Sequence, residues 1–230
     1  VKIDTNGMGV ITFGGHGGSS AMGAVDDVMP TAYGESFDIL SATNEQSTAT
    51  PFNAIGSAGD DNQFHYSSGD LVDGFSISAS YVPANGTTEV ESSVDFAVAY
   101  TGMEGLTIGA GISDNEEAES VTVDETTIYA TYATGGFTIG VQSSDRDHTT
   151  AGSDAESMAY GITYAVNDDM SIGYSYHEYE TESSTDEDQE SSGISASYTM
   201  GGMTLAGAMN NSDNMGGTAT KDREGYEFTL

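Results

Sequence analysis

Four carboxylates in one long connecting stretch, residues 14–62, are the side chains best placed to act on a charged solute. They are Asp26, Asp27, Glu35 and Asp38. Apolar neighbours such as Met22, Val25 and Phe37 give the stretch a surface that can pack, whereas the carboxylates must contact water or a cation. A connection well beyond about 12–15 residues is usually functional or disordered. We interpret residues 14–62 as an insertion that folds into the lumen of a barrel and narrows a water-filled passage.

Sequence patterns for a catalytic centre are missing. The four histidines (His16, His65, His148 and His177) are dispersed without metal-ligand spacing, which favours ordinary wall or loop positions over a zinc site. No Gly-x-Ser-x-Gly motif offers a nucleophile, and the glycine pairs precede no helix that could bind phosphate. Cysteine is absent. The sequence therefore predicts that the protein is not an enzyme.

A run of adjacent acids in the stretch 180–190 is the one candidate for metal binding. Asp186, Glu187 and Asp188 could hold calcium through carboxylate oxygens. The spacing of an EF-hand loop is absent, so a solvated charge run is the favoured interpretation. Calcium is accordingly the only cofactor considered.

The charge balance limits the partners. The chain carries 37 Asp plus Glu against 4 Lys plus Arg, a formal net charge of −33. Nucleic acid is an implausible partner, because its affinity depends on basic groups that contact phosphates. An acidic surface of this kind repels anions and attracts cations.

Apolar and polar residues alternate along nearly the whole chain, which predicts strands with two different faces. Tight turns rich in Gly, Asn and Asp alternate with longer acidic connections. We expect the acidic connections at about 114–124, 145–154, 180–190 and 212–223 to lie at the same end as the base of the insertion. This places Arg146 and Arg223 in loops.

A transmembrane antiparallel β-barrel explains this pattern better than a soluble β-sandwich. Strands of about 10 residues with an apolar and a polar face, joined by short turns at one end and longer loops at the other, are typical of outer-membrane barrels. The polar set of Ser, Thr, Gly, Ala, Asp and Asn suits a wet channel. Aromatic residues such as Phe75, Tyr100 and Phe137 lie near strand ends, as membrane-interface girdles do. No apolar run reaches the ~20 residues of a membrane helix.

The chain resembles the Gram-negative trimeric general porins, which have a constriction loop inside the barrel. The resemblance rests on the hairpin VKIDTNGMGVITFGG, the following insertion GGHGGSSAMGAVDDVMP, the later run of hairpins and the final strand EGYEFTL. It implies one barrel domain over residues 1–230, with 14–62 as the constriction loop. We count about thirteen strands where the family has roughly sixteen. We therefore expect about three strands to be missing before Val1, and a few residues to be missing after Leu230.

The resemblance also implies a function. The family sets acids of the loop against bases on the opposite wall, which assigns Asp26, Asp27, Glu35 and Asp38 to the acidic side and offers Lys2 for the basic side. The expected protein is a homotrimer in the outer membrane, in contact with lipid and lipopolysaccharide, that passes small hydrophilic solutes and prefers cations. The alternative is a structural or adhesive barrel with a plugged lumen and acidic loops that bind partners.

Overall fold

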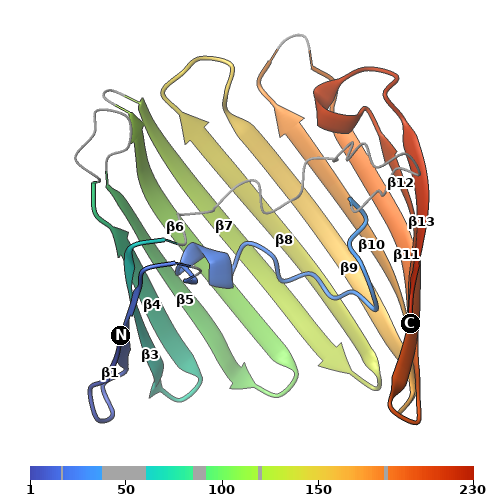
Figure 1. The fold of residues 1–230 in the computed structure, drawn as a ribbon, viewed down its shortest axis with the longest axis horizontal. Coiled ribbons are helices and arrows are strands. Elements are labelled where there is room, and N and C mark those ends of the chain that lie inside the picture. Colours follow the sequence, from blue (N-terminus) through green and yellow to red (C-terminus); the bar gives the residue numbers. More distant parts are fainter. Residues whose placement is uncertain (17, 38–60, 85–91, 119–120, 184–185) are drawn as a thin grey trace. The chain divides into compact units, whose positions relative to one another are not determined.

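The computed structural model describes residues 1–16, 18–37, 61–84, 92–118, 121–183 and 186–230. These residues form antiparallel strands with almost no helix (Figure 1). The only helical segments among them are two 3-10 turns, η1 (Met22–Ala24) and η3 (Met215–Gly217). The strands are β1 (Lys2–Asp4), β2 (Val10–Gly14), β3 (Gln63–Val72), β4 (Phe75–Val82), β5 (Ser93–Met103), β6 (Leu106–Ala118), β7 (Val121–Thr134), β8 (Phe137–His148), β9 (Ala155–Asn167), β10 (Met170–Thr181), β11 (Gln189–Met200), β12 (Met203–Asp213) and β13 (Arg223–Thr229).

Strand pairing follows the order of the chain. In the part that the structure describes, thirteen strands form one sheet in which each strand pairs with its neighbours in sequence, from β1 to β13. This order confirms the predicted all-β fold built of successive hairpins. Tight turns join the strands at one end, and at the β7–β8 turn both Gly135 and Gly136 adopt positive φ, 56° and 85°. A two-residue turn with both φ values positive matches the twist of a hairpin, and glycine reaches it without a steric cost.

The residues group into two compact units. The first comprises Val1–Val28, Asn53–Ala130 and Ser143–Glu156, and the second comprises Met29–Phe52, Thr131–Gln142 and Ser157–Leu230. Strands β7, β8 and β9 contribute residues to both units. The insertion segments before and after the boundary between Val28 and Met29 are therefore described separately, each against the strands of its own unit.

Each strand has an apolar and a polar face, in the predicted register. On β5, Phe96 and Val98 are exposed while Asp95 and Ala97, on the opposite face, are buried. We call the face that carries Asp95, and the equivalent side of the other strands, the polar face. Six apolar residues that the alternation assigns to one face of their strands are all exposed: Phe96, Val98, Ile108, Ile139, Ile172 and Leu205. Because a slip of one residue would exchange the two faces, this agreement confirms the strand register.

The acidic connections are shorter than predicted. Strand β6 continues to Ala118 and β7 begins at Val121, so the loop expected at 114–124 is mostly strand. Asp114 pairs with Val94 of β5 instead of lying in a loop. The prediction was wrong because it ended each strand where the apolar residues stopped. Ladder hydrogen bonds join backbone groups, so pairing continues where both faces are polar.

Candidate functional site

The segment of the insertion that ends at Val28 lies on the polar face of β4, β5 and β6. The backbone N–H of Ala21 donates to Ser80 Oγ on β4, at 2.6 Å. Asp95 on β5 has no solvent exposure, because the insertion covers it. Its carboxylate lies close to the backbone amide of Met22 and to Ser20. The insertion is thus tied to polar groups of the wall.

Apolar packing supports the same contact. Met22 and Val25 form a buried cluster with wall residues Ala97 and Tyr129. On β6 the facing position is Gly111, where a Cβ atom would lie 2.4 Å from Met22 Sδ and 2.7 Å from Val25 Cγ2. Glycine inside a strand often marks a close approach of another segment. Here the insertion approaches more closely than any side chain at position 111 would allow.

The next described segment of the insertion, Met29–Phe37, lies on the polar face of the second unit. The backbone N–H of Ala32 donates to Ser195 Oγ on β11, at 3.3 Å. Asn210 Nδ2 on β12 donates to the backbone carbonyl of Glu35, at 2.6 Å. Tyr33 donates its hydroxyl hydrogen bond to the Glu227 carboxylate on β13. Three strands therefore hold this segment, and two of these bonds are to its backbone.

A buried histidine lies below the end of the described segment. The ring of Phe37 stands edge-on to His177 of β10, with centroids 5.7 Å apart. His177 Nε2 lies 3.0 Å from Ser157 Oγ on β9. The histidine has no solvent exposure, so it cannot contact a solute in this arrangement.

The four insertion acids have different surroundings. Asp26 is 5% exposed, Asp27 is exposed and Glu35 is half-buried. Asp38 lies outside the described residues. Asp26 and Asp27 belong to the first unit and Glu35 to the second. Their role in a constriction stays a prediction. Asp27 is exposed and Glu35 is partly exposed, so both can contact a solute.

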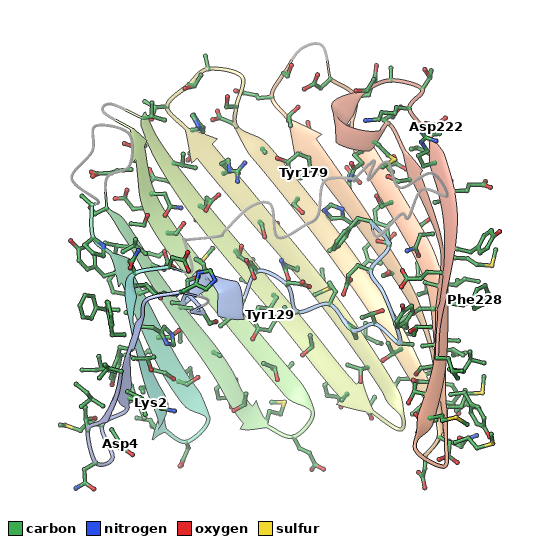
Figure 2. All side chains as sticks on the ribbon, viewed as in Figure 1. Lys2, Asp4, Tyr129, Tyr179, Asp222 and Phe228 are labelled. Atoms are coloured by element: carbon green, nitrogen blue, oxygen red, sulfur yellow. The ribbon has the colours of Figure 1, made fainter. Side chains whose placement is uncertain are left out.

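Lys2 lies on the polar face of β1, where the sequence placed it. It pairs with Thr12, which pairs with His65 on β3. The same transverse row continues through Ser80 to Asp95. Side chains of paired residues share a face of the sheet, so exposed Lys2 is on the same side as the insertion (Figure 2).

Arg146 and Arg223 are in strands, which corrects their prediction as loop residues. Arg223 is the first residue of β13 and pairs with Ser212. Arg146 lies near the end of β8 and forms an ion pair with Glu125 of β7. Its Nε and Nη2 atoms lie 3.0 and 2.9 Å from Glu125 Oε1. The Arg146 side chain is 25% exposed, against 3% for Glu125.

Two further donors complete the surroundings of Glu125. Ser113 Oγ donates to Glu125 Oε2 at 3.1 Å, and Asn115 Nδ2 donates to the same oxygen at 3.2 Å. Both carboxylate oxygens of Glu125 thus accept hydrogen bonds, and the negative charge of Glu125 balances the positive charge of Arg146 on the neighbouring strand. Sequence reasoning missed this pair. The β-branched residues Val121, Val123 and Thr127 on either side of Glu125 were a signal that β7 reached this far.

The predicted calcium ligands come together only in part. Oxygen atoms of Glu178, Glu180 and Asp188 lie within 4.8 Å of one another. Of the three predicted acids, this group contains Asp188 alone. Asp186 instead accepts a hydrogen bond from Thr181 Oγ1 at 3.2 Å, and the backbone N–H of Glu187 donates to the carbonyl of Gly217 at 3.0 Å. Two of the grouped acids are exposed, as solvated carboxylates commonly are, and calcium binding stays a prediction.

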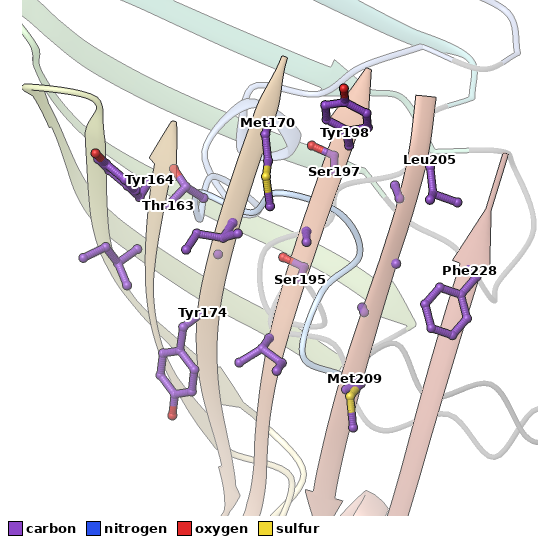
Figure 3. Close-up of a pocket in the computed structure, with 18 of the residues that line it drawn as sticks. Thr163, Tyr164, Met170, Tyr174, Ser195, Ser197, Tyr198, Leu205, Met209 and Phe228 are labelled. Carbon is purple, nitrogen blue, oxygen red and sulfur yellow. The ribbon is translucent and has the colours of Figure 1, made fainter. Parts of the chain in front are cut away.

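A groove of the second unit lies on the other face, and its lining is mainly apolar. It has a volume of about 710 Å³ and opens on the apolar face of β9 to β13 (Figure 3). Apolar side chains line it, among them Ile172, Leu205 and Phe228. Such a surface suits hydrocarbon, and a hydrophilic solute would find few polar partners there. The insertion and the polar face are therefore the candidate site.

Comparisons with known proteins identify the family and the fold of the chain. In the described residues, no helix has the length and apolar content needed to cross a membrane. The model of the family "Gram-negative porin" matches residues 1–229. A search of curated proteins gave no match.

Solved porin structures share the fold. An anion-selective porin from Comamonas acidovorans is 18% identical, with a TM-score of 0.59 over 72% of this chain and 54% of that chain. In-vitro folded OmpT of Vibrio cholerae, in a trimer form, is 15% identical, with a TM-score of 0.65 over 99% of this chain and 79% of that one. Salmonella typhi OmpF in complex with daunomycin is 13% identical, with a TM-score of 0.66 over 99% and 75%. This chain thus spans about half the length of the Comamonas protein and about three quarters of the other two. The fold is that of a transmembrane antiparallel β-barrel of the outer membrane, and the chain belongs to the Gram-negative porin family.

Proposed function

We infer that the protein forms a water-filled channel for passive diffusion of small hydrophilic solutes through the outer membrane, narrowed by the insertion. The observation that carries this proposal is the position of the insertion. In each unit it lies along the polar face, fixed to wall residues such as Ser80 and Asn210. A segment held against the wall leaves the remaining cross-section of a barrel open to water.

The distribution of charge supports a preference for cations. Among the described residues of the polar face and the insertion, acids outnumber bases. The acids are Asp4, Asp26, Asp27, Glu35, Asp95, Glu125 and Glu227; the bases are Lys2, Arg146 and Arg223. Arg146 is already paired with Glu125, which reduces its attraction for anions. Carboxylates in a narrow aqueous passage with low-dielectric walls focus a negative potential on the permeating ion.

The fold alone does not decide the sign of the selectivity, because one porin of similar fold is described as anion-selective. The preference proposed for this chain rests on its own residues. The basic side of the constriction includes Lys2, which is exposed on the polar face.

We also infer a homotrimer, embedded in outer-membrane lipid and lipopolysaccharide, with one barrel domain in each subunit. A structural neighbour in a trimer form supports the oligomeric state. The continuous row of apolar side chains on the outer face of β9 to β13 supports the contact with lipid. The molar mass of the protein in detergent, corrected for bound detergent, tests the trimer.

The second candidate is a structural or adhesive barrel with a plugged lumen. It is favoured by the number of wall contacts that the insertion makes, since a well-anchored plug would show the same contacts. Liposome swelling separates the two. Vesicles that contain the protein should swell in isotonic sugars at rates that fall with sugar size. Vesicles without protein, or with unfolded protein, are the control, and absence of swelling in the smallest sugar would establish the plug.

A further inference from the structure

Three glycines of the second unit lie on the polar face of adjacent strands, directly below the insertion. They are Gly140 of β8, Gly161 of β9 and Gly173 of β10. We call them the glycine seat. We propose that the glycine seat sets the free width of the channel, because it lets the segment Met29–Ala32 lie directly on the wall. The proposal rests on the channel function inferred above.

The contacts at the seat leave no room for a side chain. A Cβ atom at position 140 would lie 2.5 Å from Pro30 Cδ. At position 161 it would lie 2.7 Å from the backbone carbonyl oxygen of Pro30. At position 173 it would lie 3.1 Å from the backbone nitrogen of Ala32, and as close to the wall side chains Ser195 (Oγ, 3.1 Å) and Thr163 (Cγ2, 3.2 Å). Ordinary contacts of a Cβ atom begin at 3.4 Å, so alanine requires a shift of about 0.9, 0.7 and 0.3 Å at these positions.

The insertion is the part that would move. The wall strands are held by hydrogen bonds to a neighbour on each side, whereas Met29–Phe37 belongs to no strand among the described residues. The segment is also fixed further along, where Ala32 and Glu35 bond to Ser195 and Asn210. It cannot slide along the wall, so the direction left is away from the wall and into the passage. A larger residue in the seat should therefore narrow the channel.

The chemical nature of each contact predicts a specific rescue. The main obstacle at Gly140 is the proline ring, which Pro30→Ala removes. Met29 Cε and Sδ, at 3.2 and 3.3 Å from the added Cβ atom, remain, but they end a flexible side chain that can turn aside. The obstacle at Gly161 is a backbone oxygen, which remains in Pro30→Ala. The substitution P30A should thus relieve G140A and leave G161A unchanged. A general loss of stability would not distinguish the two positions in this way.

The experiment measures single-channel conductance in planar bilayers for the wild type, G140A, G161A, G173A, P30A and the two double variants. We expect lower conductance in G140A and G161A and a smaller loss in G173A. P30A/G140A should regain the conductance of P30A, and P30A/G161A should stay low. Ile139→Val is the matched control, because Ile139 precedes Gly140 on β8 but is exposed on the apolar face, away from the insertion, and its conductance should equal that of the wild type.

Several outcomes would overturn the proposal. One is unchanged conductance in both G140A and G161A, and another is equal rescue of both by P30A. If G161A does not fold, the conductances of G173A, G140A and P30A/G140A still test the proposal. No loss of conductance in G140A, or no recovery in P30A/G140A, would then overturn it. A wild type without any conductance would refute the channel function itself and, with it, this proposal. A conducting wild type with insensitive variants would refute the glycine seat alone.

Discussion

Substitutions of the two partners of the Glu125–Arg146 ion pair should change the permeability ratio of cation to anion in opposite directions. The substitution Glu125→Gln removes one negative charge from beside the Arg146 guanidinium on the polar face. Gln can still accept the hydrogen bond from Ser113, so the packing of this fully covered side chain is kept. Arg146→Gln removes the positive charge and leaves Glu125 as a carboxylate. The double variant restores the original net charge.

The size of the effect follows from Coulomb's law. For an ion that passes about 6 Å from the altered charge, the interaction in water is about 0.7 kcal/mol. That energy changes the permeability of each ion about threefold. Because the change has opposite signs for cation and anion, the permeability ratio of cation to anion changes about tenfold. Less water in the passage would make the change larger. We expect the ratio to fall about tenfold in E125Q, to rise about tenfold in R146Q and to return to the wild-type value in the double variant.

The assay is the reversal potential in a planar bilayer under a gradient of potassium chloride, with the dilute side near 0.1 M. The Debye length is about 10 Å at this concentration, so a charge on the wall still acts on the passing ion. Circular dichroism and thermal unfolding of each variant check that it has folded. Each single variant should lose about 1–3 kcal/mol of stability, because Arg146 is partly exposed and a fully buried broken pair would cost more. Shifts of the same sign in E125Q and R146Q, or no shift in either, would refute the placement of this pair beside the ion path.

Two further predictions concern the faces and the insertion. Arginine at Val98 or Ile172 should reduce the free energy of unfolding in lipid vesicles by about 2–4 kcal/mol if these residues lie near the bilayer midplane. Arginine at Ser171 should be tolerated, and equal tolerance at Ile172 and Ser171 would show that the faces are wrongly assigned. Replacement of the insertion acids Asp26, Asp27, Glu35 and Asp38 by Asn or Gln should reduce the cation preference even in molar salt. The same change at Asp186, Glu187 and Asp188 should alter the cation preference mainly below about 0.15 M salt, where the Debye length exceeds about 8 Å. A larger effect of this second set in molar salt would show that the insertion is not the constriction.

The strands and their faces were predictable because the information is local. Alternation with a period of two residues fixed which side of β5 carries Phe96 and which carries Asp95, and the structure confirms both. Glycine pairs such as Gly135-Gly136 located the turns for the same reason, since only a few residues adopt positive φ at low cost. The position and length of the insertion were also visible as an interruption of this pattern.

The contacts of the insertion were not predictable, because they join residues far apart in the sequence. Nothing near Gly161 indicates that Pro30 lies above it, although a glycine within a strand is a general sign of close approach. The Glu125–Arg146 pair was missed for a related reason. Arg146 follows the last apolar residue of β8, and the end of the apolar pattern was taken as the end of the strand. In this chain the ladder continues beyond the apolar region, and the polar strand ends hold the only basic residue that forms an ion pair with a wall acid in the described residues.

The most direct test of the central claim is the single-channel record of the wild-type protein in a planar bilayer under a salt gradient. The account predicts discrete conductance steps without a chemical energy source, and a reversal potential with the sign of cation preference. Absence of conductance from folded, inserted protein would establish a plugged barrel. Stable steps with a reversal potential of the opposite sign would contradict the assignment of the acidic insertion as the selective element.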